Sequence, residues 1–161
     1  MILSTHAIVG GAIASLLPSH PLLVVAAGFA SHFAIDAIPH WDYPLSVGTG
    51  VDNRGLKIDA GLVRDLVFIG ADACAGLAIA LFIFATATTA WVIALGAIAS
   101  MLPDPLRFAH SICPREPLKS LQRFHQWIHS KRKLAWRVGV SSQAAFAAAV
   151  SILALCSGCA A

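Results

Sequence analysis

The segment SHFAIDAIPHWD, residues 31–42, places four ionisable side chains at the end of an otherwise apolar stretch. His32 and Asp36 are four residues apart and therefore share one face of a helix. The proline that follows ends this helix, so His40 and Asp42 can fold back toward it. Imidazole and carboxylate groups gathered in this way are typical of a metal site or of an acid–base site.

Further histidine and aspartate residues could join this cluster. His6 lies about one turn inside the first apolar run, Asp72 lies in the third, and Asp104 follows the fourth. His125 and His129 form a second pair at the spacing that shares a helix face. Nitrogen and oxygen ligands in this number suit one or two divalent ions, with zinc as the first choice and manganese or iron as alternatives.

The composition predicts a membrane protein. The chain of 161 residues is 58% hydrophobic and 12% charged, and its mean hydropathy is +0.77. About 20 residues are needed to cross a hydrocarbon core of about 30 Å. The fold expected for residues 1–161 is therefore all-α, a single integral-membrane bundle of about five transmembrane helices and one amphipathic interfacial helix. The apolar runs are about 2–17, 21–38, 62–84, 88–102 and 134–157.

The basic residues predict an orientation for this bundle. All eleven lie in the loops 39–61 and 103–133 or in the first turn of the run that follows each loop. By the positive-inside rule, the amino terminus and both loops are cytoplasmic and the carboxyl terminus is outside. We expect a multi-pass protein of a bacterial inner membrane, with a periplasmic carboxyl terminus.

This orientation predicts that the ionisable residues converge. At 1.5 Å per residue, His6, His32 and Asp72 would lie roughly 6–12 Å inside the same face. An ionised side chain at that depth costs on the order of 3 kcal/mol and usually marks a functional site. The sequence therefore predicts one cytoplasm-facing pocket. The alternative for His6 taken alone is a simple hydrogen bond to a neighbouring helix.

The segment LKSLQRFHQWIHSKRK, residues 118–133, has the pattern of an amphipathic helix on the membrane surface. Lys131, Arg132 and Lys133 would reach anionic lipid headgroups. The alternative is a solvated surface helix without ligands. Loop 39–61 is rich in Gly, Asp and Asn, and we expect a flexible segment that covers the pocket.

Four motifs carry a resemblance to a known family. They are THAIVGGAIAS at 5–15, the SHFAIDAIPHWD segment, MLPDP at 101–105 and FHQWIH at 124–129. In these motifs the chain resembles small bacterial membrane-bound metal-dependent hydrolases. It is more distantly similar to zinc-dependent phospholipases C, in which an early His, a HxxxD helix and a Pro-Asp contribute to a multi-metal site. The resemblance implies metal-dependent hydrolysis at a membrane.

The expected function is hydrolysis of a phospholipid or a lipid-linked phosphoester or diphosphate, with the metal supplying hydroxide. Arg107 and Arg115 would bind the substrate phosphate. The residues expected to hold metal are His6, His32, Asp36, His40 and Asp72. The residues expected to act as base or to complete a second metal position are Asp104, His125 and His129.

Two other classes of protein fit the same residues. A metal-ion or proton transporter would also gather His and Asp inside helices, although its pathway should continue to the other side. A non-catalytic accessory subunit would use them to tie helices together. No nucleotide-binding glycine loop is present, and no nucleic-acid partner is expected.

Overall fold

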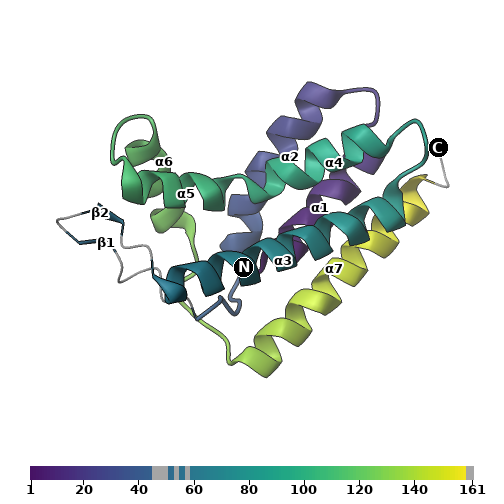
Figure 1. The fold of residues 1–161 in the computed structure, drawn as a ribbon. Helices are drawn as coiled ribbons and strands as arrows, with labels where there is room; N and C mark the ends of the chain where they lie inside the picture. Colours follow the sequence, from purple (N-terminus) through teal and green to yellow (C-terminus); the bar gives the residue numbers. More distant parts are fainter. Residues whose placement is uncertain (45–50, 53–54, 57–58, 159–161) are drawn as a thin grey trace.

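The fold is a bundle of helices (Figure 1). The computed structural model of the protein describes residues 1–44, 51–52, 55–56 and 59–158. Two-residue strands, β1 (Val51–Asp52) and β2 (Gly55–Leu56), pair antiparallel in the loop before α3. The helices are α1 (Leu3–Leu16), α2 (Pro21–Asp36), α3 (Ala60–Phe84), α4 (Ala90–Met101), α5 (Pro103–Ile112), α6 (Leu118–Ile128) and α7 (Trp136–Gly158).

The predicted helical class is confirmed, and each of the five apolar runs coincides with one of these helices to within about two residues at each end. The number of predicted membrane spans is wrong. Among the described residues, only α3, with 25 residues, and α7, with 23, are long and apolar enough to cross a membrane. Helices α4 and α5, bent by 46° at their junction, add a third span if they are counted as one.

Proline explains the shorter helices. Pro18 and Pro21 flank the turn that ends α1 and begins α2, and Pro39 follows the end of α2. The 14 residues of α1 and the 16 of α2 give helices of about 21 and 24 Å, less than a bilayer core of about 30 Å. The apolar runs predicted where these helices lie, but the prolines between the runs set the length of the helices.

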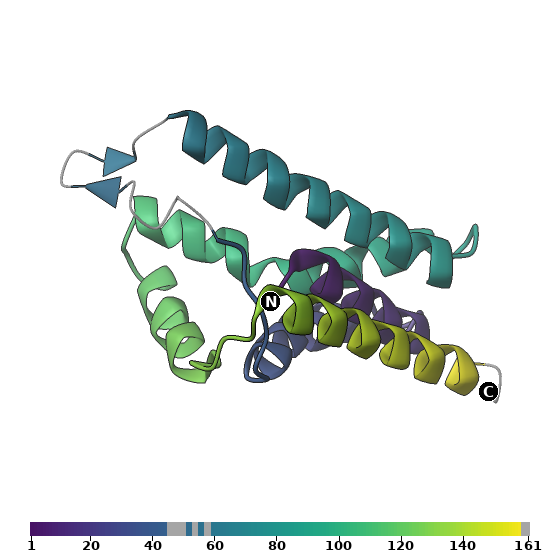
Figure 2. The ribbon, with the colours of Figure 1, turned by 90° about the horizontal axis from the view of Figure 1, so that it is seen from below.

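Helix α1 occupies the centre of the bundle and packs against α2, α3, α4 and α7. Figure 2 shows α3 on one side of α1 and α7 on the other. The contact between α1 and α4 is close because glycine faces glycine: a Cβ atom on Gly10 would collide with the carbonyl oxygen of Gly96. Small residues at such positions let apolar helices pack tightly without polar groups.

The outer helices expose apolar side chains, as lipid-facing surfaces do. Phe82 and Val67 of α3 are 91% and 66% exposed, and Leu153 of α7 is 67% exposed. The buried core lies instead where α1, α3 and α4 meet, around Ala12, Ile93 and other small or branched residues. Helices α3 and α7 therefore carry a surface suited to a membrane on their outer sides.

The loop between α4 and α7 differs from the prediction. Residues 103–112, which were predicted to belong to a loop, form a separate helix, α5. Helix α6 ends at Ile128 and not at residue 133. The chain after it is extended and runs beside the end of α2, where Leu134 N donates to the His40 carbonyl at 3.0 Å. Residues 45–50, 53–54 and 57–58 of loop 39–61, and with them much of the expected flexible cover, lie outside the described residues.

Candidate metal centre

Four helices bring histidine and aspartate to one end of the bundle, where α1 begins and α2 ends. The last turns of α2 carry His32 and Asp36, and α1 contributes His6 one turn from its start. Asp104 lies in the first turn of α5, and His125 faces inward from α6. We call this end of the bundle the site end, and the opposite end, where α1 connects to α2, the far end.

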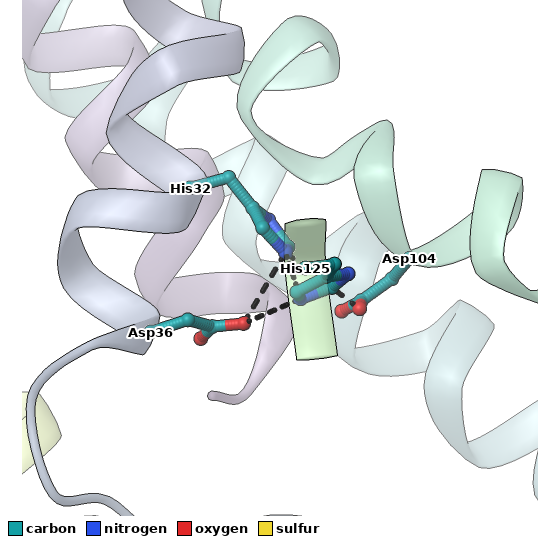
Figure 3. Close-up of side chains that lie close together, drawn as sticks. All are labelled: His32, Asp36, Asp104 and His125. Carbon is teal, nitrogen blue, oxygen red and sulfur yellow. Dashed lines mark hydrogen bonds and ion pairs between the residues drawn. The ribbon is translucent and has the colours of Figure 1, made fainter. Parts of the chain in front are cut away.

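One group of ligand atoms surrounds the Asp36 carboxylate (Figure 3). Asp36 Oδ2 lies 3.1 Å from His125 Nε2 and 3.3 Å from His32 Nε2. Asp104 Oδ1 lies 3.7 Å from His32 Nε2. One ligand atom from each of these four residues falls within 4.8 Å of the others. Asp36, His32 and His125 are buried, whereas Asp104 is 30% exposed, so this group reaches solvent through Asp104.

A second group shares Asp36 and extends toward the loop after α2. One ligand atom each from Asp36, His40 and His129 lie within 4.8 Å of one another. Asp42 belongs to the same place, because its Oδ1 lies 2.9 Å from His40 Nε2 and its Oδ2 lies 3.7 Å from His129 Nε2. The two groups together form one cluster with Asp36 between them.

A positive charge already lies in the second group. The α-amino group of Met1 donates hydrogen bonds to Asp36 Oδ1 at 2.8 Å and to Asp42 Oδ1 at 3.0 Å. It also lies 3.0 Å from His40 Nε2. Two carboxylates of the second group thus lie against a positive charge.

The tautomers of three histidines follow from their backbone contacts. A carbonyl oxygen can only accept a hydrogen bond, so a ring nitrogen that contacts one must carry the proton. The Nδ1 atoms of His32, His40 and His129 each make such a contact, at 2.8, 2.7 and 3.0 Å. Their Nε2 atoms, in the neutral ring, therefore point lone pairs at the carboxylates. Backbone contacts of this kind are what orient metal-ligating imidazoles.

The Met1 amino group is a positive partner for the His40 lone pair and the carboxylates beside it, and the lone pairs of His32 and His129 need a partner of the same kind. A second proton on each imidazole, or a metal ion, would provide it. Burial lowers the pKa of His129 below its usual value, which favours the neutral ring at neutral pH. Burial raises the pKa of a carboxyl, but at Asp42 the positive charge of the Met1 amino group, which donates to Oδ1 at 3.0 Å, acts against burial, and the pKa lies below its usual range. A neutral imidazole beside a carboxylate anion is the ligand form that metals require.

His6 lies buried against the Asp36 carboxylate. Its side chain is fully buried and stacks on His32, with ring centroids 4.0 Å apart. Within the described part of the chain neither ring nitrogen makes a hydrogen bond, although Nε2 lies 3.3 Å from Asp36 Oδ1. A buried polar group without a partner costs about 1–3 kcal/mol. His6 nevertheless belongs to neither ligand group of the described residues, so it lies beside the cluster without being placed as a ligand.

Asp72 has a different position from the one expected. It belongs to neither ligand group of the described residues. Its Oδ2 accepts hydrogen bonds from Ser4 N, at 2.8 Å, and from the Tyr43 hydroxyl. The Tyr43 oxygen in turn accepts from Leu3 N at 2.9 Å. The first amides of a helix lack partners within it, so Asp72 and Tyr43 cap α1 and fix the end of the loop that carries His40.

Helix α7 holds the same loop from the other side. Gln143 is buried, and its Nε2 donates to the Trp41 carbonyl at 3.0 Å while its Oε1 accepts from Ile2 N at 2.9 Å. Gly139 lies one turn earlier, where a Cβ atom would collide with Trp41 Cβ. Gln143 is a polar side chain inside a predicted span, and such a residue is a sequence signal for a contact of this kind.

The predicted phosphate ligands lie outside the cluster. Arg107 on α5 and Arg115 after it are both exposed. The basic side chain at the cluster is Lys133, whose Nζ lies 3.5 Å from Asp42 Oδ2 and which is 70% exposed. Sequence reasoning assigned Lys133 to lipid headgroups, because its place beside Asp42 depends on the extended chain after α6.

Of the site residues expected from sequence, the structure thus gathers seven and separates three. Those gathered are His6, His32, Asp36, His40, Asp104, His125 and His129. Asp72, Arg107 and Arg115 lie elsewhere. Comparisons with protein-family models, with curated proteins and with solved structures found no match to the chain.

Proposed function

We propose that the protein is a membrane-embedded hydrolase that binds one or two divalent metal ions at Asp36 and cleaves a phosphoester or diphosphate bond of a lipid. The observation that carries the proposal is the set of imidazole lone pairs of His32, His40 and His129 directed at Asp36 and its neighbours. The motif resemblance to membrane-bound metal-dependent hydrolases supports the same reaction class.

The donor set indicates the kind of ion. Imidazole nitrogen and carboxylate oxygen suit zinc first, and also manganese or iron. His32, Asp36, Asp104 and His125 would hold one ion, and Asp36, His40, Asp42 and His129 a second. A bound ion of this kind lowers the pKa of water toward about 7 and so supplies hydroxide at neutral pH.

The chain's own residues divide the remaining work. Asp104 is the most exposed member of its ligand group, so it faces incoming substrate and can accept a proton from the attacking water. Lys133, which contacts Asp42, would exchange this partner for a phosphate oxygen of the substrate. Substrate would arrive from the leaflet at the site end, and by the positive-inside rule this would be the cytoplasmic leaflet of a bacterial inner membrane.

A transporter remains the second candidate, because buried imidazole and carboxylate groups can also pass protons or metal ions. The sequence argues against a continuous path: residues 7–16, 22–31, 73–84, 90–101 and 138–158, which make up the far parts of α1, α2, α3, α4 and α7, contain no ionisable side chain except Cys74 and Cys156. Uptake of zinc or protons into liposomes would favour the transporter, and its absence the hydrolase.

Zinc content tests the proposal. Purified protein exposed to zinc and then dialysed should retain one to two ions per chain, and His32→Asn should lower that number. His20→Asn is a matched control, because His20 is exposed at the far end of the bundle. Retention of no metal by the wild type, or equal retention by the two variants, contradicts the proposal.

A further inference from the structure

Helix α6 has two faces with different surroundings. Its inner face carries Gln122 and His125, which are 7% and 3% exposed, and His125 contacts Asp36. Its outer face carries Trp127, which is 77% exposed. Phe124 lies between the two, half-exposed, with its ring 5.0 Å from that of Phe33 and 6.0 Å from that of Trp127. Any contact made by the outer face therefore acts on an element that holds metal ligands.

The outer face is basic as well as aromatic. Lys119, Arg123 and Trp127 follow one another at four-residue intervals, so they form one stripe along α6. Lys131 and Arg132 follow shortly after the helix, and they are exposed like Lys119 and Arg123. Residues 116–133 contain five basic residues and one acidic residue, which is a net charge of +4. The stripe is complementary to a negatively charged surface.

The position of the stripe in the chain indicates which surface this is. Lys133 is three residues, or about 10 Å of chain, before Trp136, where the membrane-length helix α7 begins. Figure 1 shows α5 and α6 at the end of the bundle where α3, the other membrane-length helix, begins. A segment that leads into a transmembrane helix lies at the membrane surface, and exposed Trp and Lys/Arg side chains are typical of that layer.

We propose that the stripe formed by Lys119, Arg123 and Trp127 binds the headgroups of an anionic bilayer, and that this contact holds His125 and His129 in the metal centre. The inference rests on the proposed metal site. Besides its metal ligands, α6 is fixed to α2 by Phe124 and by Ser130 N, which donates to the Asp36 carbonyl at 2.8 Å. If lipid headgroups and a metal ion both order α6, each must strengthen the binding of the other.

Hydrogen exchange tests the membrane contact without any metal. The full chain is placed in nanodiscs of phosphatidylcholine alone or with about 30% phosphatidylglycerol, with a chelator present throughout. Amides of residues 118–128 should exchange more slowly in the anionic nanodiscs. The protection should be lost in the double variant Lys119→Gln/Arg123→Gln and weakened in Trp127→Ser. Trp91→Ser is the control, because Trp91 is 60% exposed at the far end.

Zinc affinity tests the coupling. In the wild type, competition with a chromophoric chelator should show zinc binding about fivefold tighter in anionic than in neutral nanodiscs. The double variant should show a smaller ratio, and this comparison removes the general attraction of zinc to anionic lipid. Equal ratios in wild type and variant overturn the coupling but leave the metal site intact. Unchanged hydrogen exchange overturns the membrane contact, and no zinc binding in either lipid overturns the proposed function as well.

Discussion

The two ends of the helix bundle are buried to a similar degree but by different chemistry. At the far end, Val24, Ile93 and Phe84 fill the space between helices with apolar side chains. At the site end, His6, Asp36 and similar side chains are as deeply buried. The far end is complete in itself, whereas the buried polar groups of the site end need compensating charge. We therefore propose that one end serves packing and the other ligand binding, and this division can be tested by perturbing each end separately.

The largest expected effect follows loss of the carboxylate that both ligand groups share. Asp36→Asn keeps the shape of the side chain but removes its negative charge, so zinc binding should weaken by at least about 100-fold at both positions. Titration with a chromophoric chelator measures this. If Asp36→Asn binds zinc like the wild type, the site end is not a metal centre. Asp104→Asn should have a smaller effect. Asp104 belongs to one ligand group only, so its substitution should remove at most one ion.

The opposite perturbation is made in the far core. Ile93 is fully buried there, and Ile93→Ala should lower the free energy of unfolding by about 2 kcal/mol or more through lost packing. Thermal unfolding in detergent measures the loss. Zinc stoichiometry should stay at the wild-type value in the folded variant. A loss of zinc with intact folding would show that the two ends are not separable.

Removal of metal should affect the site end selectively. A ligand present at 100 times its dissociation constant stabilises the folded state by about 2.7 kcal/mol. Chelation of zinc should therefore speed hydrogen exchange in the last turns of α2 and in α6, while the amides of α4 around Ile93 keep their protection. Uniform loss of protection along the chain would contradict the division between the ends.

A smaller effect is expected from the contact between α7 and the loop that carries His40. Gln143→Ala leaves the Trp41 carbonyl without its donor, so the second ion should bind about tenfold more weakly while the first is unaffected. Isothermal titration with zinc separates the two events. Gln143→Glu retains an acceptor for Ile2 N but loses the donor to Trp41, and it should share the defect. Unchanged binding of both ions in Gln143→Ala would show that α7 does not position this loop.

The sequence predicted much of the fold because apolar runs and breakers act locally. The i, i+4 spacing placed His32 with Asp36 and His125 with His129 on shared faces, and the structure joins these pairs. The number of membrane spans could not be read in the same way, since α1 and α2 are too short to cross and α4 is long enough only if it is counted together with α5. The position of Asp72 depended on Tyr43, a loop residue whose partner is set by tertiary packing. The depth of Asp72 along its helix could not show whether its carboxylate caps α1 or binds a metal ion.

The most direct test of the central claim is anomalous scattering at the zinc absorption edge from crystals of the zinc-loaded protein. The account predicts a peak among Asp36, His32 and His125, and a second one toward His40 and His129 at full loading. Absence of a peak next to Asp36, or zinc bound only at exposed side chains away from the site end, would contradict it.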